Sequence, residues 1–315
     1  MSTLPDEFLP LIEAAPGLSL IGNTPLVPVS LPGLSKPGVE IYAKVEYFNP
    51  GGSIKDRPVL WMLLSAILDG RLTRERTVLD SSSGNAGIAY AMIGGALGYK
   101  VKLIVPENAS EERKKRILAH GGELEFTDAI EGYDEALREV RRQAEADPEK
   151  YFFCDQYSNE NNWKAHYHTT AVEILEQTGR KITHFVAGVG TGGTISGVGQ
   201  FLKEKRKDIQ IVGVDPVGSL YYDYFQHMNK SARQPDKLIL LHTPDINVLL
   251  RRIAQRGREE EPRGQRQHHV RDLLGRVRQV AVHADQHRVL RRAKAVDHRR
   301  RQPARAGAFD EPDPV

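Results

Sequence analysis

Short β-branched or apolar runs alternate with longer helical patterns from about residue 40 to residue 215, and this alternation limits the possible folds more than any other feature of the chain. Seven runs have the length and composition of strands: IYAKVEYF (41–48), TVLD (77–80), KVKLIVP (100–106), ELEFTD (123–128), YFFC (151–154), ITHFVAG (182–188) and IQIVGVDP (209–216). The helical patterns between them cover 55–69, 85–97, 110–120, 133–146, 162–177 and 193–206. This order predicts an α/β fold in which helices cover both faces of parallel sheets.

A break in the alternation indicates two lobes. Five strand–helix units precede the polar stretch ADPEK (146–150), and the others follow it. We therefore predict an N-terminal α/β lobe (1–155), a second and incomplete α/β lobe (156–235) and an arginine-rich tail of doubtful order (236–315), with a cleft between the lobes. Residues of about 15–40 could instead pack on the second lobe.

Three unusual segments follow predicted strands, where open parallel sheets bind ligands. They are NPGGSIKDR (49–57), SSSGNAG (81–87) and GVGTGGTISG (188–197). The last leads into a helix, and the unpaired N–H groups of a helix start suit a phosphate. A glycine-rich turn can equally be structural, and the Gly-Lys-Ser/Thr of a P-loop is missing here.

The serine segment also has two readings. Serines before a helix are ordinarily caps. However, hydroxyls, exposed N–H groups and an amide side chain at the top of a sheet could hold a carboxylate, and this segment offers them at Ser82, Ser83, Gly84, Asn85 and Ala86.

Lys55 lies in the first of the three segments. An ordinary surface lysine at a helix start would be protonated and solvated. A lysine desolvated in a cleft can instead lose its proton and form a Schiff base with an aldehyde. The neighbouring Gly51, Gly52 and Ser53 favour the second interpretation, because a loop without bulky side chains leaves room for a flat cofactor ring.

NPGGSIKDR, SGNAG and GVGTGGTISG, in this order, resemble the pyridoxal-phosphate enzymes of fold type II, in particular the cysteine synthase and cystathionine β-synthase branch. Supporting stretches are IGNTPLVPV (21–29), PENASEERKKRILAHGGEL (106–124), DQYSNENNWKAHYHTTAVEI (155–174) and IVGVDP (211–216). The resemblance covers residues 20 to about 225 and implies a two-lobed, tryptophan synthase β-like fold.

The resemblance also implies roles for individual residues. Lys55 would carry pyridoxal 5′-phosphate covalently, and Asn85 would hydrogen-bond the phenolic oxygen of its ring. The phosphate cradle would be Gly190, Thr191, Gly192, Gly193 and Thr194. The substrate carboxylate would bind at Ser82, Ser83, Gly84, Asn85, Ala86 and Gln156. Ala86 departs from the threonine usual in the family, so one hydroxyl contact is missing.

The reaction implied is β-replacement through an aminoacrylate intermediate, with an amino acid and a sulfur nucleophile as substrates. O-acetylserine and sulfide would give L-cysteine; serine and homocysteine would give cystathionine. PENASEERKKRI and DQYSNENN favour the first reaction, whereas DPVGS (215–219) favours the second. We expect the first reaction, with cystathionine synthesis as the alternative. An alternative of another class is an inactive homologue that acts as a binding partner. A homodimer is expected from the resemblance alone.

The tail departs from this family. Residues 251–315 contain 17 Lys+Arg and 9 Asp+Glu, whereas residues 1–250 contain 27 and 32. No serine follows Ser231, although the family places a serine turn against the pyridine nitrogen. We consider a reading-frame shift between residues 225 and 250, a nucleic-acid-binding extension, or a divergent folded end with a helix at 270–282. Nine acids and the lack of interleaved aromatic residues argue against nucleic acid.

The cysteine count and the apolar runs of the sequence indicate the cellular compartment of the protein. One cysteine, Cys154, excludes an internal disulfide framework and a multi-cysteine metal site, and its apolar surroundings predict a buried core thiol. The first residues lack the pattern of a signal peptide, and no run approaches the ~20 apolar residues of a membrane helix. We therefore expect a cytoplasmic protein without a membrane segment or a metal site.

Overall fold

The structure is a computed structural model, and it describes residues 4–30, 38–215 and 239–242. All of these residues belong to one compact unit, Met1–His283. The expectations for the arginine-rich tail, namely the frame shift, the nucleic-acid-binding extension and the helix at 270–282, lie outside the described residues.

The first parallel sheet has the strand order β5-β4-β3-β6. Its strands are β3 (Thr77–Asp80), β4 (Val101–Pro106), β5 (Glu123–Thr127) and β6 (Tyr151–Phe153). In the register, Leu79 of β3 pairs with Lys102 of β4 and with Phe153 of β6. The helices around the sheet are α2 (Asp56–Leu68), α3 (Asn85–Ala96), α4 (Glu111–Ala119) and α5 (Gly132–Ala146). The prediction of an α/β fold with parallel strands is confirmed.

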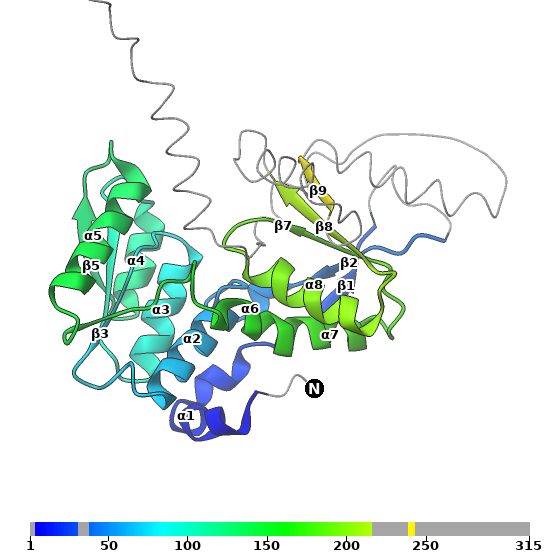
Figure 1. Cartoon of the computed structure of the whole chain (residues 1–315), viewed down its shortest axis with the longest axis horizontal. Coiled ribbons are helices and arrows are strands. Elements are labelled where there is room, and N and C mark those ends of the chain that lie inside the picture. The colour runs from blue at the N-terminus through cyan, green and yellow to red at the C-terminus, as the bar shows by residue number, and fades with distance from the viewer. Residues whose placement is uncertain (1–3, 31–37, 216–238, 243–315) are drawn as a thin grey trace, which may run out of the picture. The chain divides into compact units, whose positions relative to one another are not determined.

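Successive side chains of these strands enter hydrophobic clusters on opposite faces of the sheet, as the period of two requires. On one face, Leu79 and Ile104 pack with Ala136 and Val140 of α5. On the other, the cluster combines strand residues such as Val78 with the buried side chains of α2, α3 and α4. Figure 1 shows α5 and α3 on the two sides of β3. Cys154 is buried in the second cluster, which confirms the prediction of a core thiol.

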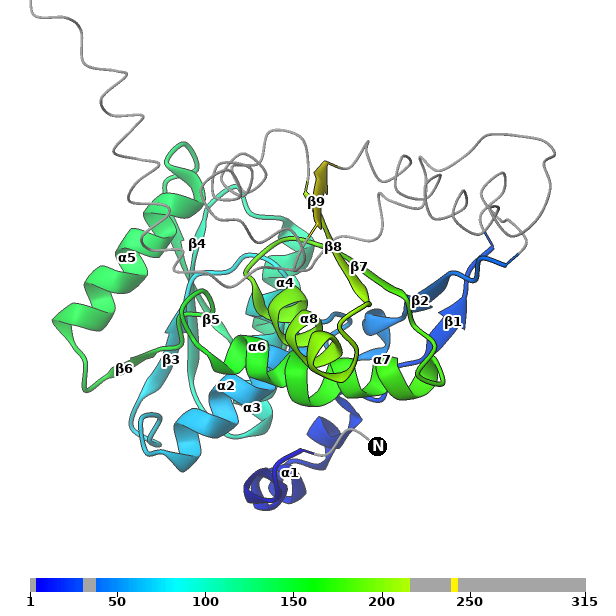
Figure 2. The same cartoon turned by 45° about the vertical axis from the view of Figure 1, so that its right-hand side comes forward.

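The second parallel sheet has the order β7-β8-β9. It consists of β7 (His184–Gly188), β8 (Gln210–Asp215) and β9 (Ile239–His242). Helices α7 (Ala171–Gln177) and α8 (Gly193–Lys205) supply most of its hydrophobic cluster, whose buried members are Ala171, Ile174, Leu175, Ile195, Val198, Leu202, Ile209 and Ile211. Figure 2 shows α8 beside β7 and β8. All strands of this sheet follow β6 in the chain, so the two parallel sheets are formed by separate parts of the sequence.

The N-terminal segment forms η1 (Asp6–Phe8), α1 (Leu9–Ala14) and η2 (Pro16–Leu20), and Phe8 packs edge-on against Trp61 of α2. A two-stranded antiparallel ribbon of β1 (Leu26–Pro28) and β2 (Tyr42–Lys44) follows. The strand predicted at 41–48 is therefore too long, and it does not join a parallel sheet. Residues Glu46–Phe48 form the 3₁₀ helix η3 instead, because Asn49 Nδ2 donates to the Glu46 carbonyl at 2.8 Å and closes the chain into a turn.

The single helix predicted at 162–177 is divided into three parts. They are α6 (Asn161–Ala165), the π-helical turn η4 (His166–Thr170) and α7. Thr169 Oγ1 donates to the Ala165 carbonyl at 2.6 Å, and a hydrogen bond from a threonine side chain to the carbonyl four residues earlier often bends a helix. Helix α8 also packs very closely here, since a Cβ atom at Gly197 would collide with the carbonyl of Trp163. Single π turns of this kind frequently occur at functional sites.

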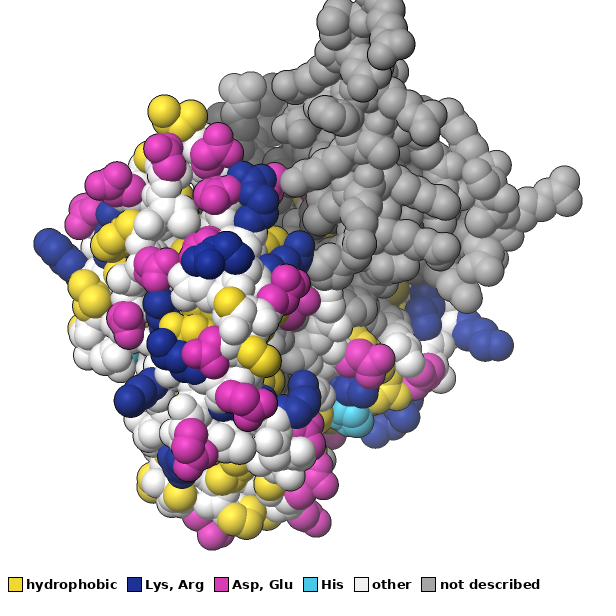
Figure 3. All heavy atoms as spheres, turned by 60° about the vertical axis from the view of Figure 1, so that its left-hand side comes forward, with side chains coloured by type: hydrophobic (Ala, Val, Ile, Leu, Met, Phe, Trp, Pro, Cys, Tyr) yellow, Lys and Arg dark blue, Asp and Glu magenta, His cyan; other side chains and the backbone are white. Residues whose placement is uncertain are grey.

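No helix in the described part of the chain is long and apolar enough to cross a membrane. Within the described residues, no group of three or more His, Cys, Asp or Glu side chains is arranged to hold a metal ion. Figure 3 shows acidic and basic side chains interspersed over the described residues of one face. Several exposed pairs lie on or beside α5, including Arg138 with Glu131 at 3.0 Å, and such surface pairs contribute about 1 kcal/mol or less each.

Candidate functional site

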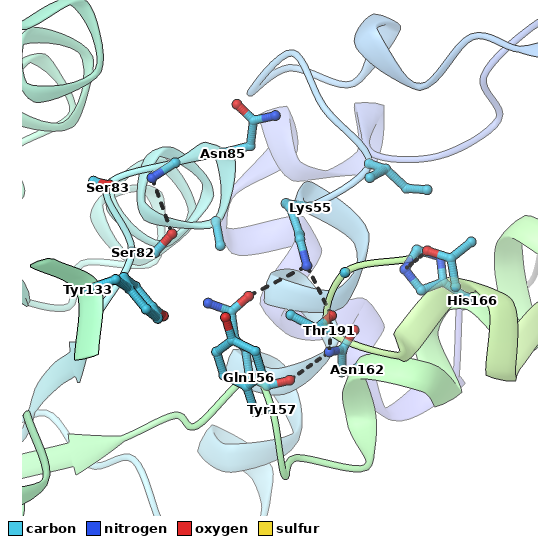
Figure 4. A pocket seen from close by; sticks show the side chains of 15 residues that line it. Lys55, Ser82, Ser83, Asn85, Tyr133, Gln156, Tyr157, Asn162, His166 and Thr191 are labelled. Carbon is cyan, nitrogen blue, oxygen red and sulfur yellow. Dashed lines mark hydrogen bonds between the residues drawn. The ribbon is translucent and has the colours of Figure 1, made fainter. Parts of the chain in front are cut away.

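A pocket of about 370 Å³ lies where the three unusual sequence segments meet. Its size falls in the range of small-molecule sites. Figure 4 shows Lys55 between the serine segment on one side and Thr191 on the other. The lining residues are Ile54, Lys55, Ser82, Ser83, Gly84, Asn85, Ala86, Tyr133, Gln156, Tyr157, Asn162, His166, Gly190, Thr191 and Thr194.

Lys55 is the N-cap residue of α2, and its side chain enters this pocket. Its Nζ donates to Thr191 Oγ1 at 3.1 Å and makes a longer contact of 3.5 Å with Gln156 Oε1. Burial lowers the pKa of Lys55 to about 8, although the nearby Asp80 carboxylate acts in the opposite direction. This amine therefore loses its proton more readily than a solvated lysine does, and a neutral amine can act as a nucleophile or a base.

The loop that carries Lys55 is held by its two glycines. Gly52 has a φ of 76°, in the left-handed region that favours glycine. Gly51 has no space for a side chain, because a Cβ atom there would collide with the Asp56 carboxylate. The same carboxylate accepts the Gly51 N–H at 2.6 Å, and Arg116 donates to the Gly51 carbonyl at 3.0 Å. These contacts fix the backbone that places Lys55.

A buried ion network anchors the start of α2 to α7. Arg57 donates to Glu173 at 2.6 Å and to Glu46 at 2.8 Å, and Lys44 donates to Glu173 at 2.6 Å. Arg57 and Glu173 are only 1% and 4% exposed. Burial alone would raise the pKa of Glu173, but its hydrogen bonds to Arg57 and Lys44 lower that pKa to about 2. Asn23 joins this network, because its N–H donates to Glu173 at 3.0 Å.

The serine segment forms the wall of the pocket at the start of α3. Gly84 is the N-cap residue of this helix, and no side chain caps the helix. The hydroxyl of Ser82 accepts the Gly84 N–H at 3.3 Å. The interpretation of these serines as helix caps is therefore not what the structure shows. An uncapped helix start facing a pocket is suited to an anion such as a carboxylate.

The glycine turn forms the opposite wall. Gly190, Thr191 and Thr194 line the pocket, but Gly192 and Gly193 do not. Gly192 is the N-cap residue of α8 and has a left-handed φ of 111°. Gly193 packs against Asn162, whose Oδ1 would collide with a Cβ atom at that position. All five predicted residues therefore lie in this turn. Gly190, Thr191 and Thr194 face the pocket, whereas Gly192 and Gly193 shape the turn.

Four polar pocket residues were not identified from the sequence: Tyr133, Tyr157, Asn162 and His166. Asn162 and His166 lie in the segment DQYSNENNWKAHYHTTAVEI, where polar side chains interrupt a helical pattern, and that interruption was a usable signal. Asn162 Nδ2 donates to Thr191 Oγ1 at 3.0 Å and to the Gln156 carbonyl at 2.6 Å.

His166 is buried and contacts Thr194 Oγ1 through Nε2 at 2.9 Å. Its Nδ1 lies 2.9 Å from the hydroxyl of Thr170. Burial, together with the charges of Arg57 and Lys55, holds the pKa of His166 well below its usual value. The imidazole is therefore neutral, and one of its nitrogens is a hydrogen-bond donor while the other is an acceptor.

Comparisons with known proteins agree with this geometry. A family model described as "Pyridoxal-phosphate dependent enzyme" matches residues 18–294. A cysteine synthase of Aquifex aeolicus (strain VF5) is 47% identical over 249 residues, which cover 76% of this chain and 76% of that protein. A cystathionine beta-synthase of Apis mellifera is 41% identical over 206 residues, 64% of this chain and 41% of that protein. The crystal structure of a cysteine synthase from Entamoeba histolytica matches with a TM-score of 0.63 and 40% identity, covering 66% of this chain and 62% of that one.

Proposed function

Because this chain belongs to the family of pyridoxal-phosphate-dependent enzymes, we propose that it forms L-cysteine from O-acetylserine and sulfide by replacement at the β-carbon. The observation that carries the proposal is the position of Lys55, an amine with a pKa of about 8 between the serine segment and the glycine turn. Relatives named cysteine synthase support the choice of reaction.

The residues of the pocket fit the cofactor of this family. Lys55 supplies an amine that can bond to an aldehyde. The start of α8 has no side-chain cap, so its N–H groups and the hydroxyls of Thr191 and Thr194 suit a phosphate. An added Cβ atom at Gly190 would meet no described atom within 4 Å, which means that the turn leaves space at this point. Asn85 would hydrogen-bond the ring from the other wall.

The chemistry can be assigned to atoms of this chain. When bound, pyridoxal phosphate draws electrons from the α-carbon of an amino acid and so makes its α-proton acidic. Lys55 Nζ is the group that would take this proton, since a base with a pKa near the working pH is the most effective. Thr191 Oγ1 accepts a hydrogen bond from Nζ at 3.1 Å, and Gln156 Oε1 lies 3.5 Å from it.

The serine segment would bind the carboxylate of the amino acid. Ser82, Ser83 and Asn85 offer polar side chains there, and the uncapped start of α3 offers N–H groups. Ala86 contributes only its backbone, because it lacks the hydroxyl of the threonine that is usual in the family. Gln156 completes the binding site from the segment after β6.

Cystathionine synthesis from serine and homocysteine is the second candidate. The similarity to the cystathionine beta-synthase of Apis mellifera supports it, and the same pocket residues would serve both reactions. Assays that offer sulfide and homocysteine in parallel, each with O-acetylserine and with serine, separate the two. A higher kcat/KM for homocysteine with serine would replace the proposal.

A direct experiment tests the proposed role of Lys55. Purified protein incubated with pyridoxal phosphate is reduced with borohydride, digested and analysed by mass spectrometry. We expect a pyridoxyl group on Lys55 and, in the unreduced protein, an absorbance band that Lys55→Ala abolishes. A colourless protein that stays unmodified would support the alternative of an inactive binding partner.

Two further proposals concern the oligomeric state and the cellular location of the protein. We propose a homodimer, for which the aromatic pair Tyr47 and Phe48 offers an apolar contact, since these side chains are 71% and 61% exposed and their ring centroids lie 5.2 Å apart. Light scattering after size-exclusion chromatography measures the oligomeric state, and a monomer would contradict it. A cytoplasmic location remains a prediction that cell fractionation can test.

A further inference from the structure

The phenol of Tyr133 joins α5 to the serine segment. Its hydroxyl donates to the carbonyl of Ser81 at 2.6 Å, across 52 residues of sequence. We propose that Tyr133 is a positioning residue that holds the serine segment, here residues 81–86, in the shape that binds the substrate carboxylate. The identity of the ligand rests on the proposed function. The hydrogen bond between Tyr133 and Ser81 is independent of that function.

Two further hydrogen bonds of the segment are local. The Ser81 N–H donates to Asp80 Oδ1 at 2.7 Å, and the Gly84 N–H donates to Ser82 Oγ at 3.3 Å. The turn also lies directly against α3, because a Cβ atom at Gly87 would collide with the Ser82 carbonyl. These contacts shape the turn from within. Tyr133 adds a hydrogen bond from a separate helix, so it fixes the turn relative to the rest of the lobe.

The environment of Tyr133 suits this role. Its ring lines the pocket beside Ser82, as Figure 4 shows, and it comes from the first turn of α5. Burial, followed by the influence of Tyr157 and Asp80, raises the pKa of Tyr133 well above its usual value. The phenol therefore keeps its proton at every working pH and remains a donor.

Tyr157 extends the connection to the other carboxylate-binding segment. Its hydroxyl interacts with that of Tyr133, and its neighbour in the chain is Gln156, which contacts Lys55. The two phenols thus connect the turn at 81–86 with the segment after β6. A loss of the Tyr133 hydroxyl would loosen the serine side of the binding site first.

The test compares Tyr133→Phe with Tyr99→Phe in the full-length chain. Tyr133→Phe keeps the ring in the pocket and removes the hydroxyl, so it separates the hydrogen bond from packing. Tyr99 is a matched control, since it is 8% exposed, its ring packs against Arg74 at 4.4 Å, and it does not line the pocket.

Two measurements are made on each variant. Amide hydrogen exchange is followed by mass spectrometry, and we expect faster exchange at residues 81–87 in Tyr133→Phe but not in Tyr99→Phe. Steady-state kinetics should show a KM for O-acetylserine raised about 3- to 10-fold, as the loss of one hydrogen bond predicts, with the KM for sulfide and the affinity for the cofactor unchanged.

Unchanged exchange at 81–87 would overturn the proposal, and so would a KM for O-acetylserine that stays at the wild-type value. An equal rise in both KM values would show a general disturbance and would also overturn it. If the wild-type protein forms no cysteine, the proposed function fails, whereas the exchange measurement still decides whether Tyr133 holds the segment.

Discussion

Asn162 Nδ2 and Lys55 Nζ share one acceptor, the Oγ1 atom of Thr191, at 3.0 and 3.1 Å. The amide belongs to α6 and the amine to the start of α2, so one threonine of the glycine turn connects two other elements. The Gln156 carbonyl, which also accepts from Asn162 at 2.6 Å, adds the segment after β6. The Lys55 amine is therefore positioned by groups from three other parts of the chain, namely the glycine turn, α6 and the segment after β6.

Replacement of Asn162 by alanine should weaken cofactor binding. Two buried hydrogen bonds are lost, and we expect the free energy of unfolding to fall by about 1 to 3 kcal/mol and the Kd for pyridoxal phosphate to rise about tenfold. Titration followed by absorbance measures the Kd, and urea unfolding measures the stability. Asn161→Ala, at the neighbouring position outside the pocket, is the control. Equal effects of the two variants would contradict the role of Asn162.

Substitution by alanine should affect cofactor binding at Gly190 and protein stability at Gly193. A Cβ atom at Gly190 meets no described atom within 4 Å, whereas one at Gly193 would collide with Asn162. Gly190→Ala should therefore leave the Tm of the cofactor-free protein unchanged and weaken cofactor binding, because the methyl group enters the space meant for the ligand. Gly193→Ala should lower the Tm of the cofactor-free protein. Differential scanning calorimetry with and without cofactor distinguishes them, and a lower Tm for Gly190→Ala alone would refute the assignment.

The stability of the cofactor-free protein should depend on pH through Lys55. Its folded pKa of about 8 lies below the ordinary lysine pKa of 10.5, so between these values the unfolded chain binds more protons and stability rises with pH. Lys55→Met removes this cost of burial and should stabilise the cofactor-free protein by about 1 to 3 kcal/mol at pH 7. The gain should shrink as the pH approaches 10.5. Urea unfolding at several pH values tests this, and a gain independent of pH would exclude Lys55 as its source.

Arg57 should be far more sensitive to substitution than an exposed arginine. Arg57→Ala leaves the buried Glu173 and the partly buried Glu46 without their shared partner, and breaking a buried pair in this way costs about 3 to 5 kcal/mol. Arg138→Ala on α5 removes pairs that are largely exposed and should cost less than about 1 kcal/mol. Urea unfolding of the two variants gives the comparison. Similar losses would mean that the buried network does not anchor α2.

The positions of the regular elements followed from local patterns in the sequence. The helix predicted at 55–69 is observed at Asp56–Leu68, and the strand predicted at 100–106 is observed at Val101–Pro106, because each carries a sufficient run of apolar residues at its own period. The strand predicted at 41–48 ended early, since the Asn49 side chain closes a turn that no hydrophobic period reveals. The π turn at His166–Thr170 depends on the close approach of α8, which is a contact between distant parts of the chain.

In the candidate site, too, local sequence patterns could be predicted and tertiary contacts could not. Lys55 and the two loops beside it were identified from glycine, serine and lysine in a recognisable order, because the chemistry constrains residue types within one short segment. Tyr133 was missed because it lies in an amphipathic helix of ordinary composition and reaches the pocket only through tertiary packing. His166 was missed for a related reason, since its place in the pocket is fixed by contacts such as that with Thr194, 28 residues away.

The burial of Cys154 has a practical consequence. It is the one cysteine of the chain and is 2% exposed, and its burial raises the pKa of the thiol far above the ordinary range. Maleimides and other thiol-directed dyes react with an accessible thiolate, so they should leave the native protein unlabelled. A cysteine introduced at any exposed position would then carry a fluorophore or spin label alone, without prior removal of the natural residue.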